Sequence, residues 1–242
     1  MKNFAVLDLV LPRACAVCGR TLLRHERFLC PECLADLPRT YFSNMRRNQM
    51  ADRFNDLVQW SLSGAEGPPG YIFATSLFFY RSSTGYSNIT RRLKYHSDLG
   101  IGRYFANMLG EELSQSNLYS DVDVVLPVPL HWLRRWTRGY NQAEVIARAV
   151  ASHLGAEVRT DILRRTRRTH SQALLTLDEK KVNVSGAFSV RNDAGLSKYN
   201  HSLIVDDVFT TGATLFSCFK VLKETMSPKS RVSIATLASV GY

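Results

Sequence analysis

The sequence predicts an α/β protein: a parallel sheet flanked by helices, with a small metal-binding module before it. Apolar, strand-like runs alternate with helical patterns from residue 71 onward, and 45% of the 242 residues are hydrophobic. Four of the five cysteines lie between positions 15 and 33. Strands that alternate with helices form βαβ units, and these units build parallel sheets covered on both faces.

The expected elements follow one another from residue 71 to residue 238. Apolar and β-branched runs predict strands at 71–80, 123–128, 202–208 and 232–238. Apolar residues at helical spacing predict helices at 99–113, 142–154 and 212–226. Ligands of such sheets bind at the carboxyl ends of the strands, so the loops after the strands are the first place to look for a site.

Glycines and prolines at positions 64 to 70 mark the strongest candidate domain boundary. We therefore expect a metal-binding module at 1–40, a linker at 41–70 and the α/β domain at 71–242.

The cysteines are spaced for a metal site. Cys15 and Cys18 form one CxxC pair, Cys30 and Cys33 form a second, and eleven residues separate the pairs. A redox CxxC or a disulfide is the alternative, but two pairs this close favour structural zinc held by four thiolates. A closed site has no open coordination position, so we expect the zinc to fold the module rather than catalyse. Cys218 borders an apolar helix face and is predicted to be a buried small hydrophobe.

The first residues do not read as a signal peptide. The apolar run 4–11 is short, Asp8 interrupts it, and Pro12-Arg13 stands where small residues should precede a cleavage site. No stretch approaches the roughly 18 apolar residues that span a bilayer. We expect a cytoplasmic protein without membrane insertion.

Residues 203–214 combine an apolar strand, the acid pair Asp206-Asp207, a threonine–glycine loop and the start of a helix. Amides at a helix N-terminus bind phosphate, and the hydroxyls of the loop threonines can donate to it. Carboxylates accept hydrogen bonds from sugar hydroxyls or hold Mg²⁺ through water. A ribose 5-phosphate group satisfies both halves. The alternative is that the acids merely end a strand and a threonine caps the helix.

The segment VDDVFTTGAT resembles the phosphoribosyl-pyrophosphate (PRPP) signature of type I phosphoribosyltransferases. Together with the four-cysteine module, it identifies the chain as similar to the ComF family of competence-associated, phosphoribosyltransferase-like proteins. The resemblance covers essentially the whole chain. The other matching stretches are Leu93-Lys94-Tyr95, Pro127-Val128-Pro129, Arg138-Gly139-Tyr140-Asn141-Gln142, and Thr169, Gln172, Asn183 and Phe188.

The resemblance implies a type I phosphoribosyltransferase-like domain that binds PRPP with Mg²⁺. Asp206 and Asp207 would bind the ribose hydroxyls, and residues 164–183 would form a loop that closes over the site. The 5-phosphate would lie against Thr210, Thr211, Gly212, Ala213 and Thr214. The pyrophosphate would lie near the turn that contains Pro129 and Leu130.

Basic residues are concentrated in one segment. The chain carries 31 Lys and Arg against 21 Asp and Glu, and residues 131–168 hold nine Arg against three acids. Arg makes bidentate phosphate contacts, so these side chains can serve a pyrophosphate site, and Arg138 joins Asp206 and Asp207 as a predicted catalytic residue. Because Trp132, Trp136 and Tyr140 interleave with them, single-stranded nucleic acid is an alternative partner. A solvated surface is the third interpretation.

We therefore expect a phosphoribosyltransferase-like protein that binds PRPP or another ribose 5-phosphate ligand and is linked to DNA uptake and natural competence. The acceptor of a transferred ribosyl group cannot be read from these residues. The alternative is a non-catalytic protein that binds single-stranded nucleic acid or senses PRPP, and that acts with competence or recombination proteins.

Overall fold

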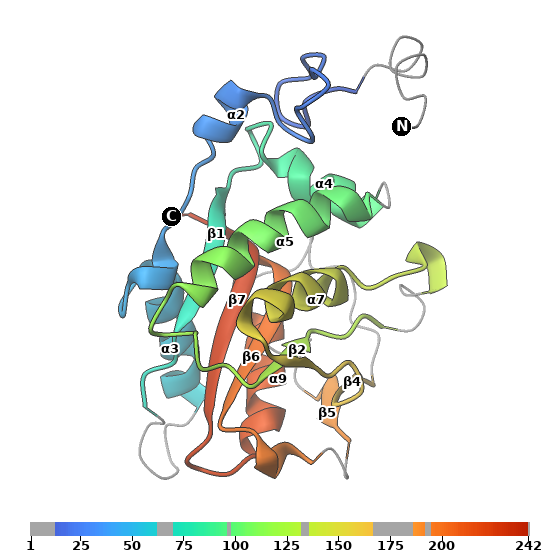
Figure 1. Cartoon of the computed structure of the whole chain (residues 1–242). Helices are drawn as coiled ribbons and strands as arrows, with labels where there is room; N and C mark the ends of the chain where they lie inside the picture. Colours follow the sequence, from blue (N-terminus) through green and yellow to red (C-terminus); the bar gives the residue numbers. More distant parts are fainter. Residues whose placement is uncertain are drawn as a thin grey trace.

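A computed structural model describes residues 13–61, 70–95, 98–131, 136–166, 186–191 and 195–241. Its centre is a five-stranded sheet in which every neighbouring pair is parallel. In order across the sheet, the strands are β1 (Ala74–Tyr80), β7 (Arg231–Val240), β6 (His201–Phe209), β2 (Val124–Pro127) and β3 (Glu157–Val158). The four strands expected from the apolar runs are thus confirmed (Figure 1), and β3 adds a short edge to the sheet.

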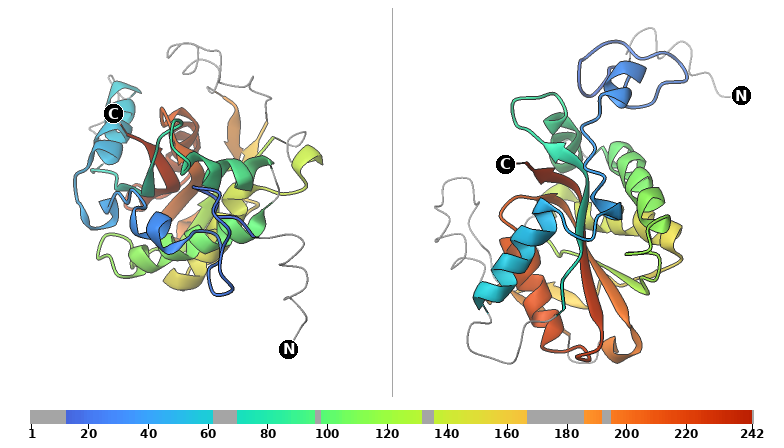
Figure 2. Two further views of the ribbon diagram at one scale, coloured as in Figure 1. Left: turned by 90° about the horizontal axis from the view of Figure 1, so that it is seen from above. Right: turned by 90° about the vertical axis from the view of Figure 1, so that its left-hand side faces the viewer.

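Helices cover both faces of the sheet, as Figure 2 shows with the sheet seen edge-on. On one face α3 (Gln49–Ser61) and α9 (Ala213–Lys223) bury their apolar sides, with the rings of Phe54 and Phe219 packed edge to face. On the other face lie α4 (Ser87–Tyr95), α5 (Leu99–Ser114) and α7 (Gln142–Leu154). Each face therefore has its own apolar core, as a doubly covered parallel sheet requires.

Helix α7 shows why these residues form these elements. The side chain of Asn141 accepts a hydrogen bond from the amide of Ala143 at the N-terminus, and Gly155 ends the helix in a left-handed conformation. Ile146 and Val150 are fully buried against the sheet. The helix has the limits that its apolar spacing predicts.

The segment 41–70 differs from the expected linker, because it contains α3. Asn48 caps this helix by accepting hydrogen bonds from the amides of Met50 and Ala51. Met50, Phe54 and Val58 are buried in the core that α3 shares with α9 and the sheet. Most of this segment therefore packs as part of the α/β domain.

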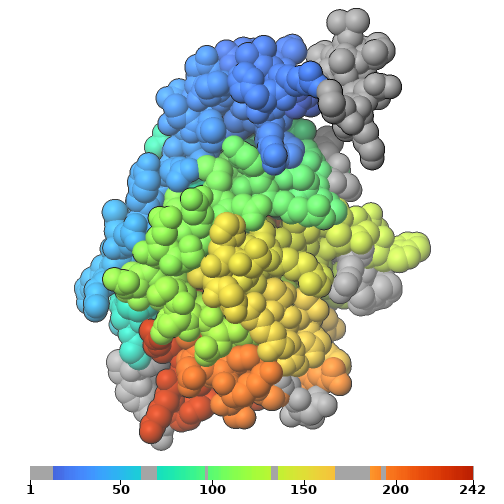
Figure 3. Space-filling view, viewed as in Figure 1, coloured from blue at the N-terminus to red at the C-terminus, as the bar shows by residue number. Residues whose placement is uncertain are grey.

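The N-terminal module lies over α4 and α5 (Figure 3). It contains the short helix α2 (Pro31–Ala35), and its buried Leu22, Leu29 and Leu37 belong to the same apolar cluster as Phe78 and Ile89. The module thus shares its core with the α/β domain. A 28-residue stretch such as 13–40 is too short to bury a sufficient core by itself.

A second, two-stranded sheet pairs β4 (Leu163–Arg165) with β5 (Phe188–Val190) in antiparallel fashion. Short 3-10 helices lie at Phe42–Asn44 and Leu196–Lys198. Among the described helices, none combines the length and the apolar character needed to span a membrane.

Candidate ligand site and zinc centre

A cavity of about 890 Å³ opens at the carboxyl ends of β2 and β6. Its walls come from β1 and α4 on one side, from the turn between β2 and α7 on another, and from β4 and the loop before α9. The lining residues singled out from the sequence are Pro129, Leu130, Arg138, Asp206, Asp207, Thr210 and Thr214. The structure thus brings together side chains from four separate segments at the edge of the sheet where the fold predicts a ligand.

The two acids of the cavity have different neighbours. The Asp207 carboxylate lies 3.0 Å from the ammonium nitrogen of Lys94 on α4, and both side chains are largely buried. The positive charges of Lys94 and of Arg165 on β4 both act to lower the pKa of Asp206. Since successive side chains of a strand point to opposite faces, adjacent acids at a strand end can serve two parts of one ligand.

Burial raises the pKa of Asp206 from an ordinary value of 3.8 to about 7, and the negative charge of Asp207 adds to the rise. A carboxyl group whose pKa is higher in the folded than in the unfolded state destabilises the fold once the pH rises above the unfolded-state pKa. The loss in the free energy of unfolding grows until the pH reaches the folded-state pKa. The Asp206 charge therefore costs stability progressively between about pH 4 and pH 7.

Asp206→Asn should consequently raise the melting temperature at pH 8 by several degrees and have little effect near pH 4, because the amide carries no charge to bury. Thermal unfolding at the two pH values measures this difference. Asp161→Asn is the control, since Arg159 holds the pKa of that exposed carboxyl down to about 2. An Asp206→Asn variant that is no more stable than wild type at pH 8 would show that the Asp206 charge does not destabilise the fold.

The loop after β6 forms a small hollow that adjoins the cavity. Its lining includes Thr210, Thr211, Gly212, Ala213 and Thr214. Gly212, the N-cap residue of α9, has φ of +78° and no side chain to cap the helix, and the Thr211 hydroxyl accepts a long hydrogen bond of 3.5 Å from the Ala213 amide. A Cβ on Gly212 would come within 2.9 Å of the Phe209 ring, so the conformation and the space both require glycine. The hollow is therefore bounded by the loop and the first turn of α9, and a helix N-terminus is a favourable place for an anion.

Cations and an amide complete the cavity. Arg138 stacks over the ring of Tyr95 with 5.2 Å between the guanidinium carbon and the ring centre. Arg165 lies over Phe188 in the same way and also lines the cavity. Gln142 is buried, and its amide nitrogen has no hydrogen-bond partner within the described residues. A buried donor on a cavity wall costs free energy unless a ligand accepts from it.

The basic segment 131–168 divides into two groups. Arg138 and Arg165 face the cavity, whereas Arg148 pairs with Glu144 at 2.7 Å and Arg159 with Asp161 at 2.8 Å on the outside. The remaining positions of interest, Trp132, Arg134, Arg135, Arg167 and Arg168, lie outside the described residues, as does most of the expected closing loop 164–183. Among the described arginines of this segment, Arg138 and Arg165 are therefore the ones that line the cavity.

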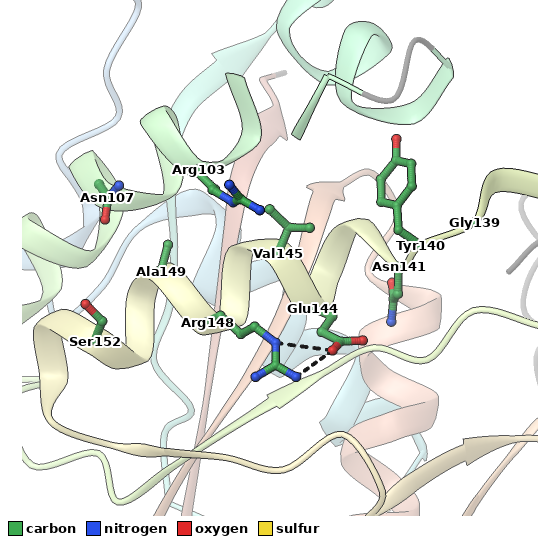
Figure 4. A pocket seen from close by; sticks show the side chains of 10 residues that line it. All are labelled: Arg103, Asn107, Gly139, Tyr140, Asn141, Glu144, Val145, Arg148, Ala149 and Ser152. Atoms are coloured by element: carbon green, nitrogen blue, oxygen red, sulfur yellow. Dashed lines mark hydrogen bonds and ion pairs between the residues drawn. The ribbon is translucent and has the colours of Figure 1, made fainter. Parts of the chain in front are cut away.

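A second hollow, of about 490 Å³, lies between α5 and α7 (Figure 4). Glu144 and Arg148 pair across one helical turn within it, and Arg103 projects from α5. An i,i+4 ion pair of this kind stabilises an exposed helix modestly. The hollow lacks the acid pair and loop that distinguish the first cavity.

The four cysteines of the N-terminal module converge on one point. Their sulfur atoms all lie within 4.8 Å of one another, and those of Cys18 and Cys30 are 3.8 Å apart. A tetrahedral zinc ion with Zn–S bonds of about 2.3 Å separates its sulfur ligands by about 3.8 Å. The four residues thus fit a structural zinc ion, and Cys218, on α9, is buried in the core as predicted.

The zinc module contacts the start of α4 directly. The side-chain amide of Asn88 donates to the carbonyl of Ala16 at 3.1 Å, and the Tyr86 hydroxyl donates to the carbonyl of Cys33 at 3.0 Å. A Cβ on Gly85 would meet the carbonyl oxygen of Val17 at 2.2 Å. The module therefore rests directly on the helix whose other end carries Lys94.

Gly85→Ala is expected to loosen the module, because the added methyl group overlaps main-chain atoms of Val17 that cannot turn aside. Limited proteolysis should cut the variant faster within 20–30 than wild type, at unchanged zinc content. Gly70→Ala is the matched control, since a Cβ there meets nothing within 4 Å. Equal cleavage rates in Gly85→Ala and wild type would contradict the close contact.

Comparisons with known proteins agree with this architecture. Residues 141–241 match the phosphoribosyl transferase domain family, and residues 6–43 match the double zinc ribbon domain family.

Relatives of the chain carry names from DNA uptake. Competence protein F of Haemophilus influenzae is 29% identical over 57% of this chain and 62% of that protein, so the match spans less than two thirds of the relative. DNA utilization protein YhgH of Escherichia coli K12 is 26% identical over 86% of this chain and 83% of that protein. Among solved structures, the glutamine PRPP amidotransferase of B. subtilis aligns at 19% identity with a TM-score of 0.37, over 55% of this chain and 26% of that one.

The parallel sheet, the acid pair that ends β6 and the four-cysteine module define a phosphoribosyltransferase-like protein of the type I fold with an N-terminal zinc ribbon. Proteins similar to this chain bear the names competence protein F, ComFC and YhgH. The chain belongs to the ComF family.

Proposed function

We propose that the cavity at the ends of β2 and β6 binds PRPP together with Mg²⁺. The observation that carries the proposal is the sequence of groups that line the cavity and the adjoining hollow: two carboxylates, then hydroxyls, then the N-terminus of α9. This order matches a ribose 5-phosphate, whose vicinal hydroxyls suit the carboxylates and whose phosphate suits the helix amides.

Each site residue then has a role. Asp206 and Asp207 accept hydrogen bonds from the ribose hydroxyls, and residues 210–214 hold the 5-phosphate. Pro129, Leu130 and Arg138 also line the cavity, and the pyrophosphate with its Mg²⁺ would be bound near them. The buried amide of Gln142 supplies a further donor to that end of the ligand.

The chemistry that suits this site is displacement of pyrophosphate from the anomeric carbon by a nucleophile. The leaving group gathers negative charge in the transition state, and cations fixed in the cavity stabilise that charge. Arg138 would serve this task together with the Mg²⁺ that PRPP brings, whereas the acids would orient the sugar. No acceptor is assigned.

Ligand fragments test the assignment. PRPP with Mg²⁺ should raise the melting temperature more than ribose 5-phosphate, and ribose 5-phosphate more than free ribose, because a ligand that binds only the folded state stabilises it. ATP with Mg²⁺ is the control for an unspecific polyphosphate effect. An equal shift with ATP and PRPP would show that the cavity selects charge rather than the phosphoribosyl group.

We further propose that the protein acts in the cytoplasm, in the handling of DNA taken up by the cell. The names of two relatives, competence protein F and DNA utilization protein YhgH, support the link to DNA. Single-stranded nucleic acid is the second candidate ligand. The Trp136 side chain is 83% exposed, two residues from Arg138. An exposed ring beside a guanidinium is the combination on which single-stranded bases stack.

Oligonucleotide binding should then weaken about tenfold or more between 50 and 200 mM salt, and Trp136→Ala should weaken it about tenfold. Trp60→Ala is the matched control, because Trp60 is also 70% exposed but lies on α3. An oligonucleotide affinity that does not change with salt concentration, or that falls equally in the two tryptophan variants, would contradict nucleic-acid binding at this surface.

A further inference from the structure

One face of α4 lines the cavity. Five of its residues recur at the three-and-four spacing of a single helix side and line the cavity: Ser87, Thr90, Arg91, Lys94 and Tyr95. Ile89 and Leu93 lie on the other side of the helix and are fully buried in the core. The cavity face therefore carries two hydroxyls, two cations and a phenol ring, and none of the five side chains is acidic.

Arg91 is the cation of this face that has no partner. The Lys94 ammonium lies 3.0 Å from a carboxylate oxygen of Asp207, whereas Arg91 makes no ion pair, hydrogen bond or ring contact with the part of the chain that the structure describes. Three helical positions separate the two residues by about 4.5 Å along the axis. Arg91 thus offers a positive charge within one turn of the lysine that holds Asp207, and an anionic ligand can bind it without breaking an ion pair.

The two hydroxyls of this face can accept hydrogen bonds, but their protons are already used. Thr90 donates to the carbonyl of Ser87 at 3.1 Å, and Ser87 donates to the carbonyl of Thr84 at 2.9 Å. Both side chains are buried, and each oxygen keeps lone pairs for a further donor. A ligand on this face therefore meets a cation at Arg91 and acceptor oxygens beside it, and the exposed ring of Tyr95 offers apolar surface.

We propose that this face of α4 binds a second, small ligand that is an acid and also carries an N–H or O–H group. Its anionic group pairs with Arg91, and its N–H or O–H group donates to the hydroxyl oxygen of Thr90 or Ser87.

The role of this ligand rests on the proposed function and deepens it, because the ligand is the acceptor of the ribosyl group. In that transfer the N–H or O–H group gives its proton to water, and its nitrogen or oxygen forms the bond to the anomeric carbon. The bond from that carbon to pyrophosphate breaks, and the electron pair leaves with pyrophosphate. The binding of the acid to α4 needs no PRPP and is tested without it.

3-Aminobenzoate is a suitable probe, because it carries a carboxylate and an N–H group on one flat ring, and 3-aminobenzamide is its uncharged counterpart. Ligand-observed nuclear magnetic resonance with the zinc-loaded full chain measures both affinities. Wild type should bind the acid at least about fivefold more tightly than the amide, and Arg91→Met should abolish that preference. Arg91→Lys should retain part of it, because a point charge remains. 3-Aminophenyl phosphate, titrated in parallel, shows whether the face prefers a phosphate or a carboxylate.

Three further variants locate the probe. Arg103→Met removes an exposed arginine of α5 that lines the other hollow and has no ion pair in the described ranges, so this variant should bind the probe like wild type. A probe that lay at the pyrophosphate end of the cavity would instead lose affinity in Arg138→Met. Thr90→Val keeps the shape of the side chain and should remove the advantage of 3-aminobenzoate over benzoate, while the affinity for benzoate itself stays the same.

Equal affinities of wild type for the acid and the amide would overturn the proposal. So would an equal loss in Arg91→Met and Arg103→Met, or a loss confined to Arg138→Met. A separate titration with PRPP and Mg²⁺ distinguishes the two levels of inference. If PRPP binds but acid binding does not depend on Arg91, only the class of acceptor fails. If acid binding depends on Arg91 but PRPP does not bind, the proposed function fails and the acid site on α4 stands.

Discussion

Replacing Asp207 with alanine is expected to lower the affinity for PRPP with Mg²⁺ about 100-fold or more, without unfolding the protein. Hydrogen bonds to a charged group contribute about 1.5–3 kcal/mol each, and a carboxylate that holds two sugar hydroxyls loses both at once. The backbone of β6 should be unaffected, because the ion pair between Asp207 and Lys94 involves their side chains and not the main chain. Calorimetric titration measures the loss, and circular dichroism checks the fold.

Asp161→Ala is the matched control for that experiment. Its carboxylate pairs with Arg159 at 2.8 Å outside the cavity, so removing it takes the same charge from the chain and leaves the acid pair intact. Ligand affinity that falls equally in the two variants would mean that overall charge governs binding. Undiminished affinity in Asp207→Ala would remove the acid pair from the site.

Removing the zinc ion is expected to unfold the N-terminal module. Structural zinc in small domains contributes about 10–16 kcal/mol of apparent binding free energy, far more than the few apolar side chains of 13–40 can replace. The purified protein should contain about one zinc per chain. After chelation or in Cys30→Ser, proteases should cut within the module, and the α/β domain should lose stability because Leu22, Leu29 and Leu37 leave its core.

Cys218→Ser serves as the control, because Cys218 is distant from the four-cysteine cluster in both sequence and core. This variant should keep its zinc and the protease resistance of its module, although a buried hydroxyl costs some stability of the domain. A metal-free protein whose N-terminal module resists proteolysis as well as the loaded form would contradict a structural role for zinc.

The parts of the site that were predictable from sequence are those in which neighbouring residues act together. The acid pair, the threonine–glycine loop and the start of α9 are consecutive in the chain, so their order alone indicates a phosphoribosyl ligand. The CxxC pairs are similar: each pair places two thiolates on one turn, and the structure brings the pairs together. Strand and helix limits followed from apolar spacing, as α7 illustrates.

Long-range contacts were not predictable in this way. Lys94 and Asp207 are 113 positions apart, and only the packing of α4 beside the end of β6 brings them into contact. In the sequence, Lys94 and Gln142 stand in stretches that match the family, and Arg165 is one of the nine arginines of the basic segment. Their places in the cavity depend on the path of the chain.

Helix α3 was missed although its sequence contains a signal. Met50, Phe54 and Val58 recur at intervals of four, the spacing of one buried helix face, and Asn48 precedes them as a cap. The polar residues between them, and the glycines and prolines that follow, favoured a linker. Burial of this stripe in the core that α3 shares with α9 and the sheet decides the outcome.

The most direct test of the central claim is a calorimetric titration of the zinc-loaded wild-type protein with PRPP, in the presence and absence of Mg²⁺. We expect saturable binding of about one ligand per chain with Mg²⁺, and binding at least about tenfold weaker without it, because the metal bridges phosphates that otherwise repel the two acids. Absence of PRPP binding under both conditions, in a protein that still binds single-stranded oligonucleotide in a salt-sensitive way, would mean that the fold serves as a nucleic-acid scaffold and that the phosphoribosyl site does not exist.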